Sequence, residues 1–208
     1  MIDRAVRPMK DRLLEPLAAV APRWCGPLVL TVAALVAGLA AAATAAAGLI
    51  AWSVTLWLVG RLLDGLDGAV ARRRGTSSDL GGYLDILADT TVYAAVPIGV
   101  AVAVADRAAW IAVAVLLATL YVNVVSWAYL AALLEKRRAG AVANGEPTSV
   151  HMPAGLVEGA ETIVLYTLML AVPSLAVVWF VLMAALVAVT VVGRAVCAPR
   201  ALRDAVPR

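Results

Sequence analysis

Long apolar runs separated by short polar or basic segments make up most of this chain. A helix needs roughly 20 mostly apolar residues to cross a bilayer. Six runs approach that length, at residues 27–48, 49–66, 83–105, 108–131, 156–173 and 174–196. Because a helix satisfies its backbone hydrogen bonds internally in lipid, the pattern predicts an all-α integral membrane protein with six transmembrane helices.

A shorter amphipathic segment precedes the first run. Its apolar residues recur at helical spacing, as Ile2, Val6, Met9, Leu13, Leu17 and Val20. Charged residues occupy the opposite face, so we expect an interfacial helix at the membrane surface within residues 1–24. Because Pro8 and Pro16 interrupt this segment, a frayed tail is the alternative interpretation. Residues 25–197 would then form the six-helix membrane domain, and residues 198–208 a cytoplasmic tail.

Basic side chains gather in every second connection between the runs. They precede the first run and follow the second, fourth and sixth, as Arg4, Arg7, Lys10, Arg12, Arg23, Arg72, Arg73, Arg74, Lys136, Arg137, Arg138, Arg194, Arg200, Arg203 and Arg208. In the connections between these, Arg107 is the only basic residue. Since Lys and Arg are retained on the cytoplasmic side, we expect both termini and the loops after the second and fourth spans to face the cytoplasm.

Composition and charge support the bilayer assignment. The chain has 208 residues, of which 63% are hydrophobic, more apolar surface than a soluble domain of this size could bury in one core. The formal net charge of +3 mostly reflects the basic cytoplasmic connections. We therefore expect membrane lipids with anionic headgroups as partners, and no nucleic acid.

Four carboxylates interrupt the second and third apolar runs and their shared connection. Asp64 and Asp67 are three residues apart, and Asp85 and Asp89 are four apart, so each pair lines one face of a helix. A basic turn at residues 72–78 joins the two faces and allows them to oppose each other. Such carboxylates would repel one another at the edge of the hydrocarbon unless cations or protons neutralised them.

The ligand types in this cluster indicate a hard divalent cation. All donors are oxygens, with no His or Cys among them, which favours Mg²⁺ or Mn²⁺ over zinc. Carboxylate-held Mg²⁺ usually completes its shell with water and substrate phosphates, so the cluster also predicts a phosphate-bearing substrate. Gly68 would let a ligand approach the backbone, and Gly81 would let the two helices come close.

A transporter is the alternative function. Proton- or cation-coupled transporters also place carboxylates within the membrane. They are typically built from inverted repeats with helices broken at the midplane, and neither feature is evident in this sequence.

The segment from Asp64 to Asp89 fits the pattern D-x2-D-G-x2-A-R-x8-G-x3-D-x3-D at every fixed position. The matching residues are Asp64, Asp67, Gly68, Ala71, Arg72, Gly81, Asp85 and Asp89. In this motif the chain resembles the CDP-alcohol phosphatidyltransferases. The resemblance implies that an acceptor hydroxyl attacks the β-phosphorus of a CDP-linked donor, usually CDP-diacylglycerol, and that CMP is released, as a step of phospholipid synthesis.

The resemblance also implies roles for these residues. Asp64, Asp67 and Asp85 would ligate two Mg²⁺ or Mn²⁺ ions that bind the donor diphosphate. Asp89 would contribute to metal binding and act as the general base on a small alcohol acceptor. The CDP pocket would be lined by Gly68, Ala71, Arg72 and Gly81. By family analogy the enzyme would be a homodimer, with its active site facing the cytoplasm.

Two regions depart from the family or leave alternatives open. The family often has a Pro-Asn pair and a Thr before the first span, whereas here Pro27 is followed by Leu28, with Thr31 further on. The acceptor also stays open among glycerol 3-phosphate, serine, inositol, inositol phosphate and others. Residues that could contact it, or that could merely anchor or cap a span, are Lys136, Arg137, Arg138, His151, Glu158, Glu161 and Arg194.

Overall fold

The computed structural model describes residues 14–22, 24–137 and 159–204. These residues are almost entirely helical, and no strand occurs among them. The helices are α2 (Pro27–Ala46), α3 (Ile50–Arg74), α4 (Asp79–Val104), α5 (Arg107–Lys136), α6 (Gly159–Ala171) and α7 (Ala176–Asp204), with a 3₁₀ turn at Pro173–Leu175 before α7. The all-α prediction is therefore confirmed for this part of the chain.

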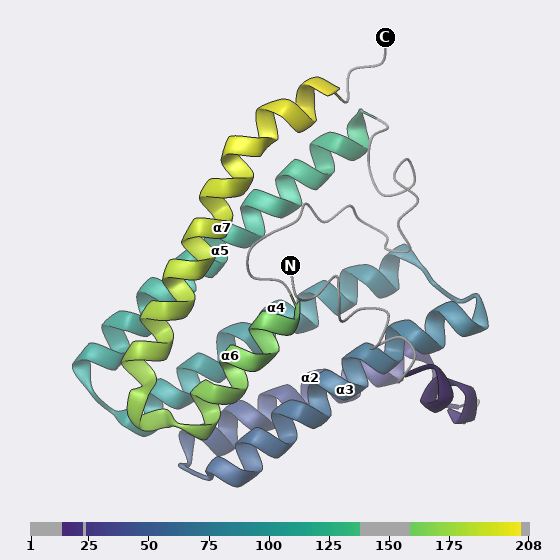
Figure 1. The fold of residues 1–208 in the computed structure, drawn as a ribbon. Coiled ribbons are helices and arrows are strands. Elements are labelled where there is room, and N and C mark those ends of the chain that lie inside the picture. Colours follow the sequence, from purple (N-terminus) through teal and green to yellow (C-terminus); the bar gives the residue numbers. More distant parts are fainter. Residues whose placement is uncertain (1–13, 23, 138–158, 205–208) are drawn as a thin grey trace.

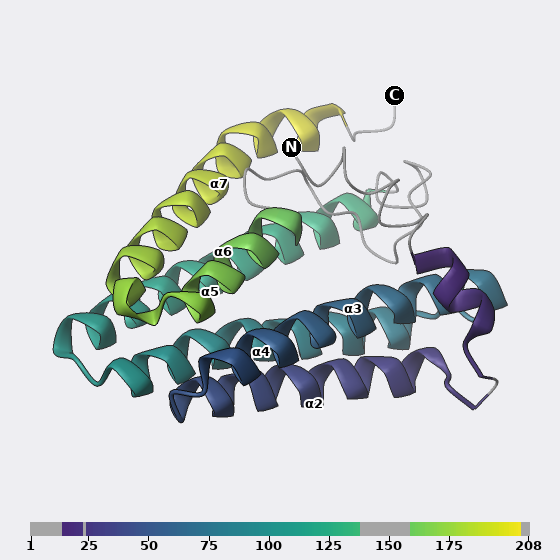
Figure 2. The same cartoon turned by 60° about the horizontal axis from the view of Figure 1, so that its bottom comes forward.

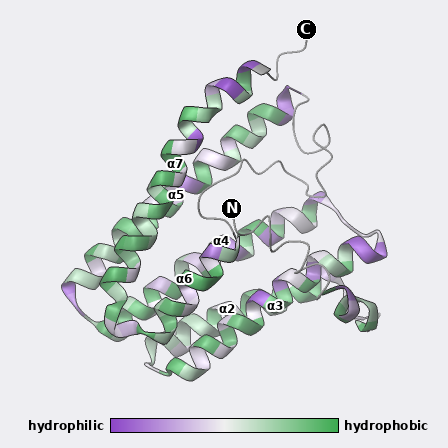
Figure 3. Ribbon diagram, viewed as in Figure 1, coloured by the Kyte–Doolittle hydropathy of each residue, from purple (hydrophilic) through white to green (hydrophobic). Residues whose placement is uncertain are grey.

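Among the residues that the structure describes, four helical stretches are long and apolar enough to cross a membrane. They are α2, α4, α5 and the continuous stretch Pro173–Arg203, which includes α7 up to its penultimate residue. The second predicted span corresponds to α3, whose Arg and Asp residues lower its hydropathy, and the fifth corresponds to α6, of which 13 residues are described. Figure 3 shows hydrophobic residues along most of each helix, and hydrophilic residues at the α3–α4 turn and the C-terminal end of α7. The exact count of six spans stays a prediction.

The N-terminal helix lies largely outside the described residues. Residues 14–20 are helical, and the purple helix of Figure 1 lies beside the α3–α4 end of the molecule. The guanidinium of Arg74 donates hydrogen bonds to the backbone oxygens of Ala21, Pro22 and Cys25 at 2.9–3.1 Å. The end of α3 is thereby tied to the segment that leads into α2. The expected interfacial position of residues 1–24 stays a prediction.

Local signals fix the turn between α3 and α4. Gly75 adopts the left-handed conformation, with φ of 63°, that ends α3. Ser78 then caps α4, because its Oγ accepts a hydrogen bond from the backbone N–H of Gly81 at 3.1 Å. The chain therefore reverses within a few residues, and α3 and α4 run antiparallel.

The helices form two groups that diverge toward the α3–α4 turn. Helix α2 packs closely against both α3 and α4, whereas α5 packs mainly against α7. Helix α6 contacts α3 and lies between the groups. Figures 1 and 2 show α5 and α7 running together away from the first group, with both groups meeting at the end that carries the α4–α5 turn.

Close helix approaches in the first group depend on small residues of α2 and α4. A Cβ built on Gly38 of α2 would lie 2.5 Å from a methyl group of Val92, and one on Gly99 of α4 would collide with the backbone oxygen of Ala42. At Gly81, where we expected two helices to come close, a Cβ would meet only the Ser78 hydroxyl within 4 Å. The close approach lies instead along α2 and α4.

We expect replacement of Gly99 with Ala to destabilise the fold by about 1–3 kcal/mol, because the added methyl group meets backbone that cannot rotate away. Thermal unfolding of the detergent-solubilised protein measures the effect. Gly193→Ala in α7 is the matched control, since a Cβ there meets nothing within 4 Å. Equal melting temperatures for the two variants would contradict the packing described here.

Candidate functional site

Two facing stripes of side chains on α3 and α4 form the centre of the site. Trp57, Arg61 and Asp64 follow one another at helical spacing along α3, and Asp85, Asp89 and Tyr93 do so along α4. The stripes run in opposite directions, so that Arg61 reaches Asp89. The distance from Arg61 Nη1 to Asp89 Oδ1 is 2.6 Å, and the distance to Asp64 Oδ2 is 3.7 Å.

The structure places the four predicted aspartates near one another, although no three of them converge on one point. The carboxyl group of Asp85 lies within hydrogen-bonding range of that of Asp64 and within electrostatic range of Asp67 and Asp89. Asp67 is buried and accepts a hydrogen bond of 2.6 Å from the Thr31 hydroxyl of α2. The cluster therefore draws on three helices, α2, α3 and α4. The sequence motif alone predicted a contribution from α3 and α4 but none from α2.

The donor set fits a hard divalent cation. The cluster supplies carboxylate oxygens, and Oδ1 of Asp85 is buried without a hydrogen-bond partner, which is a costly arrangement unless a cation or water satisfies it. Within the described ranges, no three Asp, Glu, His or Cys side chains converge on one point as a ready-made metal site. Asp67 is engaged by Thr31 and Asp89 by Arg61. The metal-ligand roles stay predictions.

A cavity of about 340 Å³ opens beside the carboxylates. It is lined by residues of α2, the end of α3, the turn and the start of α4, including Pro27, Leu28, Thr31, Asp67, Gly68, Ala71, Arg72, Ser77, Ser78, Gly81, Gly82 and Asp85. All four residues expected in the nucleotide pocket thus face one space together with two of the aspartates. Asp64 and Asp89 lie outside its lining.

Two site residues were missed by sequence reasoning. Thr31 was noted only as displaced from its usual place in the family, yet it lines the cavity and holds Asp67. Arg61 was passed over as part of an imperfect apolar run, although an ionisable residue in a membrane helix is itself a functional signal. Its partner is 28 residues away in the sequence. Spacing along one helix therefore gave no sign of the pair.

Arg61 is enclosed by aromatic side chains on the side away from the aspartates. Its guanidinium carbon lies 5.0 Å from the centroid of the Trp57 ring and 5.3 Å from that of Tyr93. Tyr166 of α6 stacks on Trp57 at 5.1 Å and packs edge-on to Tyr93 at 5.4 Å. This aromatic cluster, Trp57, Tyr93 and Tyr166, separates the carboxylates from the apolar core.

A second buried arginine lies between α5 and α7. Nη1 of Arg194 donates to Oδ1 of Asn123 at 2.9 Å and to Oγ of Ser126 at 3.3 Å, while its Nε is buried without a partner. Arg137 bonds the backbone oxygen of Leu202, which ties the end of α5 to α7. Lys136 ends α5, and Glu161 lies in the first turn of α6.

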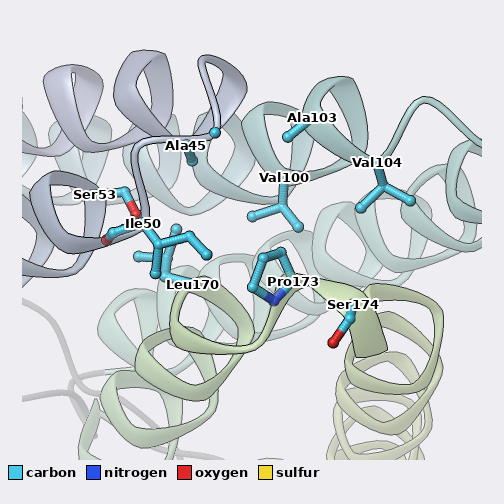
Figure 4. Close-up of a pocket in the computed structure, with 10 residues that line it drawn as sticks. Ala45, Ile50, Ser53, Val100, Ala103, Val104, Leu170, Pro173 and Ser174 are labelled. Atoms are coloured by element: carbon cyan, nitrogen blue, oxygen red, sulfur yellow. Dashed lines mark hydrogen bonds between the residues drawn. The ribbon is translucent and has the colours of Figure 1, made fainter.

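The remaining acceptor candidates, Arg138, His151 and Glu158, fall outside the described residues. Another cavity, also of about 340 Å³, lies where α2 meets α3 and α6 meets α7. Figure 4 shows its lining of mainly apolar side chains, with Ile50, Val100, Leu170 and Pro173 pointing into it and Ser174 at its edge. Its polar side chains are those of Ser53 and Ser174, and no titratable side chain lines it.

Comparison with known proteins gives consistent results. The sequence pattern of the CDP-alcohol phosphatidyltransferase family matches residues 24–192. The "Inner membrane protein YnjF" of Escherichia coli (strain K12) is 35% identical over 169 residues, which cover 81% of each chain.

Solved structures of Mycobacterium tuberculosis phosphatidylinositol phosphate synthase (PgsA1) share the fold. The structure with CDP-DAG bound has a TM-score of 0.70 at 25% identity, over 90% of this chain and 94% of that one. The structure in complex with manganese and citrate has a TM-score of 0.68 at 24% identity, over 94% of this chain and 92% of that one.

We expect Thr31→Val to destabilise the protein by about 1–3 kcal/mol, because the buried Asp67 carboxylate loses its hydroxyl donor while the side-chain volume is kept. Thermal unfolding in detergent measures the loss. Thr31→Ser keeps the hydroxyl and should retain most of the stability. If the Val variant unfolds no earlier than the Ser variant, the hydrogen bond does not hold Asp67.

Proposed function

Because this chain belongs to the CDP-alcohol phosphatidyltransferase family, we propose that it transfers a phosphatidyl group from CDP-diacylglycerol, or a related CDP-linked lipid, to a small alcohol and releases CMP. As a member of the family it is a membrane transferase of substituted phosphate groups. The observation that carries the proposal is the cavity at the α3–α4 turn. There Gly68, Ala71, Arg72 and Gly81 face one space with Asp67 and Asp85.

The cavity suits a donor that has both a nucleotide headgroup and acyl chains. Arg72 can neutralise diphosphate charge, and the hydroxyl-bearing residues Thr31 of α2 and Ser78 of the α3–α4 turn also line the cavity. Leu28 and Leu80 line the same cavity and are 54% and 65% exposed. Acyl chains can therefore extend past these leucines into the bilayer while the headgroup stays in the cavity. Figure 3 places this end among the hydrophilic helix termini.

The chemistry follows from the carboxylates beside the cavity. When bound, Mg²⁺ or Mn²⁺ supplies positive charge that stabilises the attacking and leaving oxygens, and the oxygen donors of Asp64, Asp67, Asp85 and Asp89 would hold it. The acceptor hydroxyl attacks the β-phosphorus, and the bond from that phosphorus to the bridging oxygen breaks, so that CMP leaves. Asp89 takes the hydroxyl proton. Its 30% exposed side chain remains accessible to an acceptor.

Among the acceptor candidates that the structure describes, Arg194 is the one to which we assign acceptor binding. A two-residue turn joins α4 to α5. Asp89 lies 15 residues before the last residue of α4, Val104, and Asn123 lies 16 residues after the first residue of α5, Arg107. The two residues are therefore at nearly the same distance from the turn. Arg194 bonds Asn123 and therefore lies at the depth of the proposed base, on the other helix group. Its unpartnered Nε suits an anionic group on the acceptor.

The wider assignments follow the same proposal. The active site and both termini would face the cytoplasm, since basic residues occupy the last turns of α3, α5 and α7 and such residues are retained on that side. A homodimer is proposed by family analogy. The transporter alternative is not favoured, because the family is one of transferases.

Asp89→Asn should abolish CMP release from CDP-diacylglycerol while leaving donor binding measurable, because the amide cannot accept the hydroxyl proton. The assay follows CMP in the presence of Mg²⁺ or Mn²⁺ with the acceptor present. Asp106→Asn is the matched control, since Asp106 caps α5 at the opposite end of the bundle and Asn caps equally well. Substantial turnover by the Asp89 variant would contradict the base assignment.

Arg194→Met should raise the KM for the acceptor about 10-fold or more and leave the KM for the donor unchanged, because a charge-assisted hydrogen bond is lost only on the acceptor side. A labelled donor is first tested with glycerol 3-phosphate, serine, inositol, inositol phosphate and choline to find the acceptor. Equal effects on both KM values would show that Arg194 supports the fold rather than the acceptor.

A further inference from the structure

We propose that Arg61 is a positioning residue and a built-in counter-cation of the carboxylate cluster. Its guanidinium fixes the orientation of Asp89 and limits how tightly the four carboxylates bind a divalent cation. This inference rests on the proposed metal-dependent transfer. It concerns a residue outside the eight positions of the motif.

The position of Arg61 makes its pairing obligatory. It lies 13 residues before α3 ends at Arg74, about 20 Å along the helix axis, and its side chain is only 5% exposed. Arginine stays charged at this depth, so it needs an anionic partner. Asp89 at 2.6 Å and Asp64 at 3.7 Å provide two. The guanidinium therefore offsets part of the negative charge of the cluster.

Three helices hold the guanidinium in place. The faces of Trp57 and Tyr93 enclose it, and the Tyr93 hydroxyl lies 3.3 Å from Nη1. The Trp57 indole N–H donates to Thr167 at 3.1 Å, and the Tyr166 hydroxyl donates to the backbone oxygen of Tyr93 at 2.7 Å. Since both aromatic walls are themselves fixed, Arg61 has little freedom to follow a moving carboxylate.

This fixed guanidinium determines how Asp89 is presented. The ion pair engages Oδ1 of Asp89, which leaves Oδ2 as the oxygen that can accept a proton from the substrate hydroxyl. A misplacement of a catalytic group by about 1 Å can cost about 100-fold in rate. Arg61 thus acts through Asp89, without touching the reacting atoms.

The same charge affects cation binding. A guanidinium beside Asp64 and Asp89 repels any divalent ion that these carboxylates hold. Without this guanidinium, the carboxylates would bind such an ion more tightly and release it more slowly. Arg61 therefore lowers the affinity of the site for metal while keeping its base in position.

The test measures Mn²⁺ binding by the electron paramagnetic resonance signal of free Mn²⁺, with neither donor nor acceptor present. Arg61→Met should bind Mn²⁺ about tenfold more tightly than the unchanged protein, and its kcat should fall about 100-fold with little change in the donor KM. Arg194→Met is the matched control. It removes the other buried arginine, which contacts no carboxylate in the described structure, and should leave Mn²⁺ affinity unchanged.

The variant Arg61→Lys keeps the positive charge but changes the geometry, so it separates the effect of charge from that of positioning. It also replaces the Met variant as the test if that variant does not fold. It should keep the original Mn²⁺ affinity but lose turnover, because lysine cannot reproduce the planar contacts with Asp89 and both rings. Unchanged turnover in the Lys variant, or a joint loss of Mn²⁺ affinity and turnover in the Met variant, would overturn the proposal. Asp64→Asn and Asp85→Asn should weaken Mn²⁺ binding. If they do not, the proposed metal site fails independently of Arg61.

Discussion

The ion pair between Arg61 and Asp89 is the interaction on which the site depends, because it links the two helices that carry the carboxylates. Opposite each other along α3 and α4 lie Asp64 and Asp85, then Arg61 and Asp89, and then the rings of Trp57 and Tyr93. The order runs from polar at the cavity to aromatic at the core. A charged site can therefore lie beside an apolar interior, with aromatic rings at the boundary between them.

Helix α2 provides the scaffold for this arrangement. It packs closely against α3 and α4, and Gly38 of α2 and Gly99 of α4 allow these two helices to approach each other. It also contributes a direct contact to the site, since Thr31 holds Asp67. The space between α3 and α4 is bridged by long side chains, and its width follows from how both helices pack on α2. Core packing thus sets the separation of the carboxylates to which we assign the chemistry.

Sequence patterns predicted the features that depend on spacing along one helix. Apolar run length indicated the long helices, and periodicity placed the aspartates on two opposed faces. Contacts between distant positions could not be read this way. Thr31 and Asp67, for example, are 36 residues apart. Whether Gly81 allows a close helix approach depends on which helix packs beside it, and spacing along one helix does not identify that neighbour. Arg61 and the aspartates interrupt the apolar run of α3 and so lower its hydropathy. The residues that made this span hard to recognise are therefore the same ones that form the candidate site.

The burial of Arg61 also bears on how the protein enters the membrane. Each charged residue near the centre of a lone helix costs about 2.5–3.5 kcal/mol on insertion, and α3 carries Arg61 together with Asp64 and Asp67. Its own apolar surface offers little to offset this. We therefore expect α3 to be a dependent segment during biogenesis, retained at the translocon until α4 emerges and supplies Asp89. Assembly of the ion pair and integration of the hairpin would then be a single event.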